Sequence, residues 1–165
     1  MNESVGSALL FNLVLVFVII LSGLFIGSLA YTKAFKVKNR IIEEIEKQGE
    51  HSNTPETAYR DAEEEIVSWL NGIDGQGIGY RKNFGKYNYI CNNYDYGEIQ
   101  NINSDYSYCV YQINTCVDST GKDLQRSKCG IYYHVIAFMY FDFPLVEEFP
   151  IAVHGETMTF KEQNN

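Results

Sequence analysis

Four cysteines are the residues of this sequence whose chemistry is easiest to state. Cys91, Cys109, Cys116 and Cys129 all lie in the C-terminal half of a chain of 165 residues, at separations of 18, 7 and 13 residues. No C-x-x-C pair is present, so the spacing favours neither a zinc site nor a thioredoxin-like redox pair. We expect two disulfides, which need an oxidising compartment, with four buried free thiols as the alternative.

The order of the predicted strands favours one of the three ways in which four cysteines can pair. A hairpin centred near Gln100 would bring Cys91 opposite Cys109, and closing the next hairpin would bring Cys116 to Cys129. The crossed pairings strain against the ~4.4 to 6.8 Å that a disulfide requires between Cα atoms. The predicted disulfides therefore join Cys91 with Cys109 and Cys116 with Cys129.

Histidines and acids give only a weak indication of catalysis. The histidines are His51, His134 and His154, and a hairpin centred near Leu145 would place His134 near Glu156. A His–Glu pair across a hairpin is more often a surface contact than a catalytic dyad, and no motif places a nucleophile. We expect no enzyme activity, no cofactor, no metal site and no small-molecule substrate.

Three other stretches have the composition of known motifs without their spacing. The glycines between Gly72 and Gly85 fit neither the dinucleotide fingerprint nor the Walker motif, and no strand precedes them. The run from Asn92 to Glu98 falls short of an EF-hand loop. Three successive acids, Glu63 to Glu65, point in different directions on a helix and predict solvated surface. A net charge of -8 argues against nucleic acid as a partner.

The N-terminal segment is long enough to cross a membrane. Leu9 to Tyr31 is apolar and uncharged, and a hydrocarbon core about 30 Å thick needs ~20 such residues in a helix. A cleavable signal peptide would have a positive start and a shorter apolar run, whereas Met1 to Leu10 contains no Lys or Arg. We predict an uncleaved, single-pass anchor in the lipid bilayer.

Residues within this segment predict a contact between helices. Gly23 and Gly27, flanked by Ser22 and Ser28, form a G-x-x-x-G pattern that lets two helix backbones approach closely in lipid. Asn12 adds a side-chain donor and acceptor in the same segment. The expected partner is a second copy of the chain or another single-pass subunit.

Two signals disagree about the side of the membrane on which the rest of the chain lies. Lys33, Lys36, Lys38 and Arg40 directly follow the apolar segment and would hold this flank in the cytoplasm. Disulfides would place it outside. Giving the cysteines more weight, we expect an extracytoplasmic C-terminal domain at the cell membrane, with the basic residues near anionic headgroups.

Periodicity predicts two helices after the apolar segment. Val37, Ile41 and Ile45 recur every fourth residue beside Phe35 and Ile42, and Gly49 is the expected stop. A second helix begins with Thr54 as cap and Pro55 at the first position, and Gly72 is its expected end. Its apolar stripe consists of Tyr59, Ala62, Ile66, Trp69 and Leu70.

Four runs rich in Tyr, Ile, Val and Phe predict strands at residues 86–91, 107–116, 130–143 and 149–160. In the third run, alternate residues from Ile131 to Phe143 form an apolar face, which the amphipathic helix should cover. The opposite face requires either the second helix or another subunit. The residues of this possible subunit contact are Tyr132, Ile136, Phe138 and Tyr140.

Together these elements predict an α+β fold in which a long transmembrane-plus-amphipathic helix packs on a four-stranded antiparallel sheet, with a second short helix. Residues 1–31 form the transmembrane anchor and 32–50 the amphipathic helical extension. Residues 51–85 contain the second helix and a Gly-rich connector. Residues 86–165 form an antiparallel β domain with the two disulfides. One anchor and one domain account for the length of the chain.

The whole chain resembles pilin-like and pseudopilin-like proteins, and in particular the TadE-like minor pilins of bacterial tight-adherence systems. The resemblance lies in the N-terminal LLFNLVLVFVIILSGLFIGSLAY, the helical extension KAFKVKNRIIEEIEKQ and the ending FPIAVHGETMTF. It implies a membrane-embedded structural component of an extracellular filament or of its secretion and assembly machinery, without chemistry of its own. The implied partners are other single-pass pilin-like subunits.

One residue departs from the prepilin pattern. Prepilins are cut after a Gly and usually carry Glu at the fifth mature position, where Phe11 stands after Gly6. Processing by a prepilin peptidase and incorporation through that carboxylate are therefore not implied. A stand-alone, single-pass membrane sensor or adhesion module with an extracellular β domain is the alternative.

Overall fold

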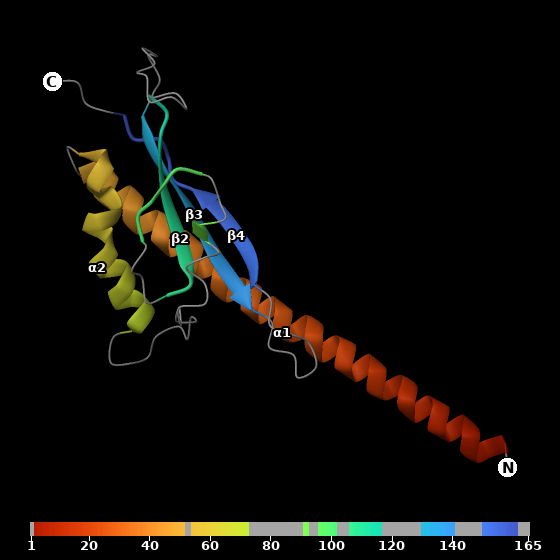
Figure 1. The fold of residues 1–165 in the computed structure, drawn as a ribbon. Coiled ribbons are helices and arrows are strands. Elements are labelled where there is room, and N and C mark those ends of the chain that lie inside the picture. Colours follow the sequence, from red (N-terminus) through yellow and green to blue (C-terminus); the bar gives the residue numbers. More distant parts are fainter. Residues whose placement is uncertain are drawn as a thin grey trace.

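The structure is a computed structural model that describes residues 2–51, 54–72, 91–92, 96–101, 106–116, 130–140 and 150–161. The described elements are α1 (Asn2–His51), η1 (Pro55–Thr57), α2 (Ala58–Asn71), β1 (Glu98–Ile99), β2 (Tyr108–Asn114), β3 (Ile131–Tyr140) and β4 (Pro150–Glu156). The sheet lies across the C-terminal half of α1 with α2 alongside, and the N-terminal half of α1 extends away from the domain (Figure 1). This arrangement is the predicted α+β fold.

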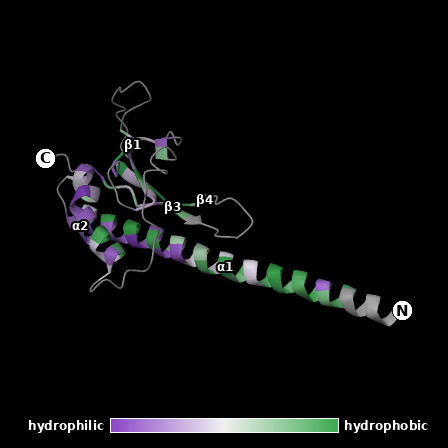
Figure 2. Cartoon of the chain, turned by 60° about the horizontal axis from the view of Figure 1, so that its bottom comes forward, coloured by the Kyte–Doolittle hydropathy of each residue, from purple (hydrophilic) through white to green (hydrophobic). Residues whose placement is uncertain are grey.

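The long helix α1 runs for 50 residues without a break. Its N-terminal half is almost entirely apolar, whereas its C-terminal half carries both polar and apolar residues (Figure 2). Val37, Ile41 and Ile45 are fully buried, which confirms the predicted stripe. Phe35 was expected beside this stripe, but its side chain is 40% exposed.

The expected stop at Gly49 is wrong, because α1 continues to His51. Gly49 is buried where the ring of Phe160 crosses the helix, and a Cβ atom at this position would overlap that ring. The backbone amide of Met158 donates a hydrogen bond to Oε1 of Glu46 at 2.7 Å. The glycine therefore allows the C-terminal segment to pack closely on the end of α1.

The second helix, α2, packs on the same face of the sheet as α1. Its buried residues are Ala58, Tyr59, Ala62, Ile66 and Leu70, and they share one core cluster with α1 and β3. Gly72 ends the helix at φ 78°, with its amide donating to the carbonyl of Ser68. Thr54 forms no side-chain cap, and Pro55 begins a short 3-10 turn ahead of the helix.

Tyrosine hydroxyls attach this helix to the sheet. The Tyr133 hydroxyl donates to the carbonyls of Pro55 at 2.8 Å and Glu56 at 3.0 Å. The hydroxyls of Tyr59 and Tyr108 lie 3.1 Å apart. Burial raises the pKa of Tyr133 to about 12 and also raises the pKa of Tyr59. Both groups therefore keep their protons at neutral pH and remain hydrogen-bond donors.

The sheet is an antiparallel meander in the order β1-β2-β3-β4. His134 pairs with Glu156, which is the register predicted for a hairpin centred near Leu145. The predicted apolar face is buried against the helices at Ile131, Tyr133, Val135 and Ala137. The remaining members of that face, the side chain of Met139 and residues 141 and 143, lie outside the described part of the chain.

The first strand differs from the prediction. Cys91 and Asn92 are helical, residues 86–90 lie outside the described residues, and β1 is the two-residue strand Glu98–Ile99. Glu98 pairs with Gln112, so the hairpin is centred at residue 105 and not near Gln100. Aromatic and β-branched residues are enriched wherever a segment packs on a half-buried surface. In so short a run, this enrichment does not distinguish a strand from a helical turn.

The last strand is also shorter than the predicted 149–160. It ends at Glu156, and pairing with β3 resumes at an isolated bridge between Ile131 and Phe160. The segment from Glu156 to Phe160 is one residue longer than the segment of β3 from Ile131 to His134. One extra residue on one strand is a β-bulge, which bends the chain locally. The bend takes the closing segment from the sheet to the end of α1.

Candidate functional site

The N-terminal half of α1 exposes its apolar side chains. Leu9 and Leu10 are each 66% exposed, and Phe25 is 68% exposed. Within the described residues, α1 is the helix that is long and apolar enough to cross a membrane. Because these apolar side chains are exposed, the surface is suitable for contact with lipid tails or with another apolar helix.

Three of the predicted interface residues lie on one side of this exposed half. Gly23 lies eleven residues after Asn12 and eleven before Ala34, which is about three turns at ~3.6 residues per turn. The three residues therefore share one side of the helix, and Gly27 lies one turn further along it. Ala34 is fully buried in the core of the domain. The side that packs on the sheet thus continues into the exposed half as a small-residue face.

Two of the predicted interface residues lie off this face. Ser28 is five residues after Gly23, which places it on nearly the opposite side of the helix at about 100° per residue. Its carbonyl accepts a hydrogen bond from Oγ1 of Thr32 at 2.8 Å. Ser22 is about a quarter turn from Gly23. Of the predicted interface residues, Asn12, Gly23 and Gly27 therefore share one side of α1, and the helix-packing interface itself stays a prediction.

A buried carboxylate on α1 fixes one of the basic residues that follow the apolar segment. Glu44 is 1% exposed, and Nη2 of Arg40 lies 2.5 Å from its Oε1 atom. Nζ of Lys47 lies 3.6 Å from the other carboxylate oxygen. Arg40 is thus held within the domain by its ion pair with Glu44. Removing Arg40 would leave the negative charge of Glu44 buried, with the more distant Lys47 to balance it.

A histidine cluster lies on the face of the sheet away from the helices. Nδ1 of His134 is 3.1 Å from Oε1 of Glu156, and its Nε2 is 3.1 Å from Nδ1 of His154. Tyr96 stacks on the His134 ring at 4.2 Å between centroids. The predicted proximity of His134 and Glu156 is therefore present, whereas sequence reasoning missed Tyr96 and the role of His154.

The two imidazoles of this cluster cannot both be protonated while their hydrogen bond persists. One nitrogen must donate and the other must accept, so a second proton would set two N–H groups against each other. Burial, followed by the charge of His134, lowers the pKa of His154. Among the described residues, no group of three or more His, Cys, Asp or Glu side chains could hold a metal ion.

The structure contains the predicted disulfide between Cys91 and Cys109, with 5.7 Å between their Cα atoms. The predicted reason for this pairing was that the two cysteines face each other across a hairpin. That reason is wrong, because Cys91 is helical and Cys109 pairs with Ile136 in the sheet. Cys116 is also disulfide-bonded, and its predicted partner, Cys129, lies outside the described residues. The first disulfide joins a helical turn to the centre of the sheet.

One of the two expectations for the second face of the sheet was that α2 covers it. This expectation is wrong, because the buried residues of α2 pack on the opposite face. The buried cluster of the second face consists of Cys109, Tyr111, Ile136 and Phe138, with Cys91, Ile99 and Ala152 packed against it. The other expectation, a subunit contact, is wrong for Ile136 and Phe138, whose side chains are 0% and 2% exposed within the chain. Tyr132 is partly exposed, and the side chain of Tyr140 lies outside the described residues.

Asn101 is a structural residue that sequence reasoning did not find. Its side chain is buried beside β2, where Nδ2 donates to the carbonyl of Tyr108 and Oδ1 accepts from the amide of Val110 at 2.8 Å. A side chain that bonds to two backbone groups of a strand replaces part of a neighbouring strand. A single Asn in a polar run gives no periodic signal, so composition alone does not reveal it.

No protein-family model, curated protein or solved structure matches this chain. The geometry of α1, the sheet and the disulfide is therefore the basis for the functional proposal.

Proposed function

We propose that this chain is a membrane-anchored minor pilin or pseudopilin-like structural component of an extracellular filament or of its secretion machinery. The observation that carries the proposal is the division of α1 into two halves. One half exposes apolar side chains to its surroundings, and the other half is the spine on which a four-stranded antiparallel sheet packs. A single helix thus serves as both lipid contact and domain core, as in the pilin-like architecture.

The small-residue face supports assembly through the membrane. Asn12, Gly23 and Gly27 lie on one side of the exposed half of α1, where two helix backbones could approach closely. In a filament, the same apolar half would pack against neighbouring subunits once it leaves the lipid. The proposed partners are other single-pass pilin-like subunits or further copies of this chain, and the proposed activity is structural and not enzymatic.

Cross-linking of the full-length chain in membranes tests this association. Gly23→Ile combined with Gly27→Ile should lower the yield of cross-linked complexes several-fold, because two branched side chains would separate the backbones. The matched control combines Val14→Ile with Val18→Ile, two residues also four apart but on the opposite side of α1. Equal yields in wild type, variant and control would show that the glycine face is not an interface.

The proposed location is the cell membrane, with the N-terminus in the cytoplasm and the sheet domain outside. The Cys91–Cys109 disulfide supports this orientation, because cytosolic thiols are kept reduced. Protease added to intact spheroplasts should remove the domain after Tyr31. Digestion only after lysis would contradict this orientation. The domain and the basic residues after Tyr31 would then lie in the cytoplasm, as the positive-inside rule predicts.

A stand-alone membrane sensor or adhesion module is the second candidate, and Phe11 favours it. The residue stands where a prepilin would carry the carboxylate used in assembly. Purification in a mild detergent separates the two functions: a filament component should co-purify with other single-pass subunits or as a multimer. A chain that runs as a monomer without partners would favour the sensor.

A further inference from the structure

The junction between the apolar half of α1 and the sheet domain carries both aromatic and basic side chains. Tyr31 is 49% and Phe35 40% exposed, and their rings stack at 6.0 Å between centroids. Nζ of Lys38 lies 4.4 Å from the centre of the Phe35 ring. Lys33 and Lys36 occupy the intervening turn of the helix. We refer to Tyr31, Lys33, Phe35, Lys36 and Lys38 as the interfacial collar.

The positions of the collar residues match the depth of a lipid headgroup layer. At ~1.5 Å per residue, Leu9 to Tyr31 spans about 33 Å, close to the hydrocarbon thickness of about 30 Å. Lys33 and Lys36 then stand about 3 and 8 Å beyond Tyr31. A headgroup layer is roughly 5 to 8 Å deep. Tyr31 lies at the depth where tyrosine side chains concentrate in membrane proteins.

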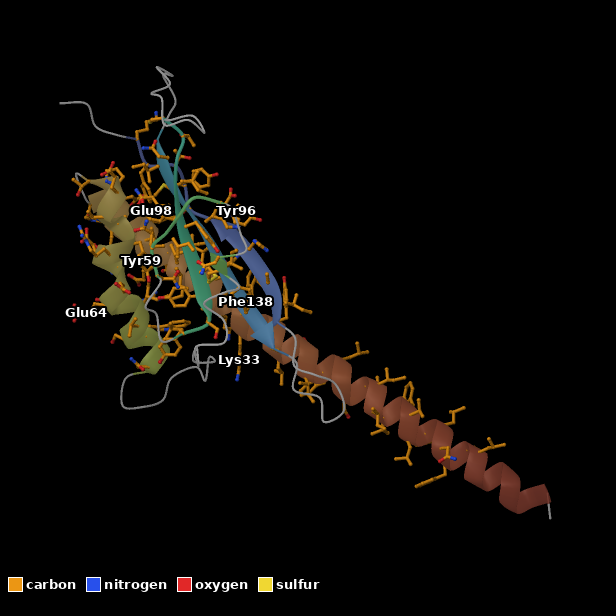
Figure 3. All side chains as sticks on the ribbon, viewed as in Figure 1. Lys33, Tyr59, Glu64, Tyr96, Glu98 and Phe138 are labelled. Carbon is orange, nitrogen blue, oxygen red and sulfur yellow. A yellow bond between two sulfur atoms is a disulfide. The ribbon has the colours of Figure 1, made fainter. Side chains whose placement is uncertain are left out.

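The lysines of the collar differ from Arg40, which the buried Glu44 holds within the domain. Among the residues that the structure describes, Lys33 and Lys36 are not within 4.0 Å of an acidic side chain. Figure 3 shows Lys33 where α1 leaves the domain. Both side chains are exposed, so their ammonium groups are available to an external anion.

The domain itself approaches the same surface. Ala34, only three residues after Tyr31, is already buried in the core of the domain. The end of β3 lies near the point where α1 leaves the sheet (Figure 1). Since the whole chain carries a net charge of -8, an anionic surface would repel the domain unless a local cationic group opposed this repulsion.

We propose that the interfacial collar binds anionic phospholipid headgroups and thereby fixes the height and orientation of the sheet domain at the membrane surface. The aromatic rings mark the edge of the hydrocarbon, and the ammonium groups contact the phosphates immediately above it. This inference rests on the proposed membrane anchor and not on the proposed role in a filament.

Lipid enrichment around the full-length chain tests the inference. The protein is inserted into vesicles of phosphatidylcholine with about a third phosphatidylglycerol, floated on a density gradient and extracted in mild detergent. The phosphatidylglycerol fraction that co-purifies should exceed the fraction in the vesicles at least two-fold. Lys33→Gln with Lys36→Gln should return it to the vesicle value.

Lys47→Gln combined with Lys161→Gln removes the same charge from positions outside the collar and should leave the enrichment unchanged. Lys47 is sixteen residues beyond Tyr31, about 24 Å along α1, and therefore more than two Debye lengths away at physiological salt. Equal enrichment in the collar variant and the control would overturn the inference while leaving the anchor intact. Wild-type protein that fails to float with the vesicles would overturn the anchor as well.

Discussion

Lys38 on α1 and Gly155 on β4 are in direct contact, and the glycine makes this contact possible. A Cβ atom at position 155 would stand 2.6 Å from Cδ of Lys38 and 2.8 Å from Cδ1 of Ile42. The missing side chain allows the aliphatic part of a lysine to lie between the edge strand and the helix. Gly155 therefore leaves room for the side chains of Lys38 and Ile42 where β4 packs on α1.

Gly155→Val should destabilise the domain by about 1 to 3 kcal/mol, because the new methyl groups would overlap with α1. Ile151→Val, on the same strand but 38% exposed, is the control and should change stability little. Thermal unfolding of the full chain in detergent micelles measures both. Lys38→Ala added to Gly155→Val should recover part of the loss, and additivity of the two changes would contradict the proposed overlap.

Asn101→Ala should destabilise the domain by about 1 to 3 kcal/mol, since two backbone groups of β2 would lose their partners. Gln100→Ala removes an amide that donates to the carbonyl of Glu98 at an exposed position. This control should change stability by less than about 0.5 kcal/mol. Similar losses for the two variants would show that the Asn101 side chain does not substitute for a strand.

The histidine cluster makes the stability of the domain depend on pH. The pKa of His154 is lowered in the folded chain, so below a pH of about 6.5 the unfolded chain binds protons more readily. The contribution of His154 to stability is therefore present above about pH 6.5 and is lost as the pH falls through the folded pKa. His154 faces His134 and Tyr96, and His134 in turn lies within hydrogen-bond distance of Glu156.

Unfolding of the full chain at about pH 7.5 and about pH 5.5 measures this dependence. His154→Gln should reduce the difference in stability between the two conditions, because glutamine cannot take up the second proton. His51→Gln, at the exposed end of α1, should leave the difference as it is in the wild type. If the His154→Gln variant kept the full wild-type pH dependence of stability, groups other than His154 would be responsible for that dependence.

Loss of the disulfide should be among the most destabilising changes. Cys91→Ala with Cys109→Ala opens a loop of 18 residues and should lower the free energy of unfolding by roughly 3 kcal/mol in the chain-entropy model. Non-reducing peptide mapping checks the bond itself and should recover a peptide that links Cys91 to Cys109. Recovery of a peptide linking Cys91 to Cys116 or Cys129 would contradict the structure.

The features predicted correctly from the sequence depend on long periodic patterns. Val37, Ile41 and Ile45 repeat at the helical period over several turns, and the alternating face of β3 is long enough to define its side. The register that pairs His134 with Glu156 follows, because a slip of one residue would turn the apolar face of the strand away from the helices.

The features that were missed depend on single residues or on contacts between distant segments. Gly49 carries the usual signal for a helix end, but the closing segment that brings Phe160 onto it is more than 100 residues away. The two-residue strand at Glu98 is too short to show any period. Cys91, Ile99 and Ala152 pack against the cluster that contains Ile136 and Phe138, and they come from three separate segments, so no local pattern encodes this packing.

The continuity of α1 also has a mechanical consequence. Because the helix passes from its exposed apolar half to the domain core without a proline or an unstructured link, it has no joint at which the sheet could swivel. A load applied to the β domain is therefore carried along one continuous helix. With the apolar half held in a bilayer, as proposed, a sideways push on the sheet domain would tilt the whole helix and would not bend it at the membrane surface.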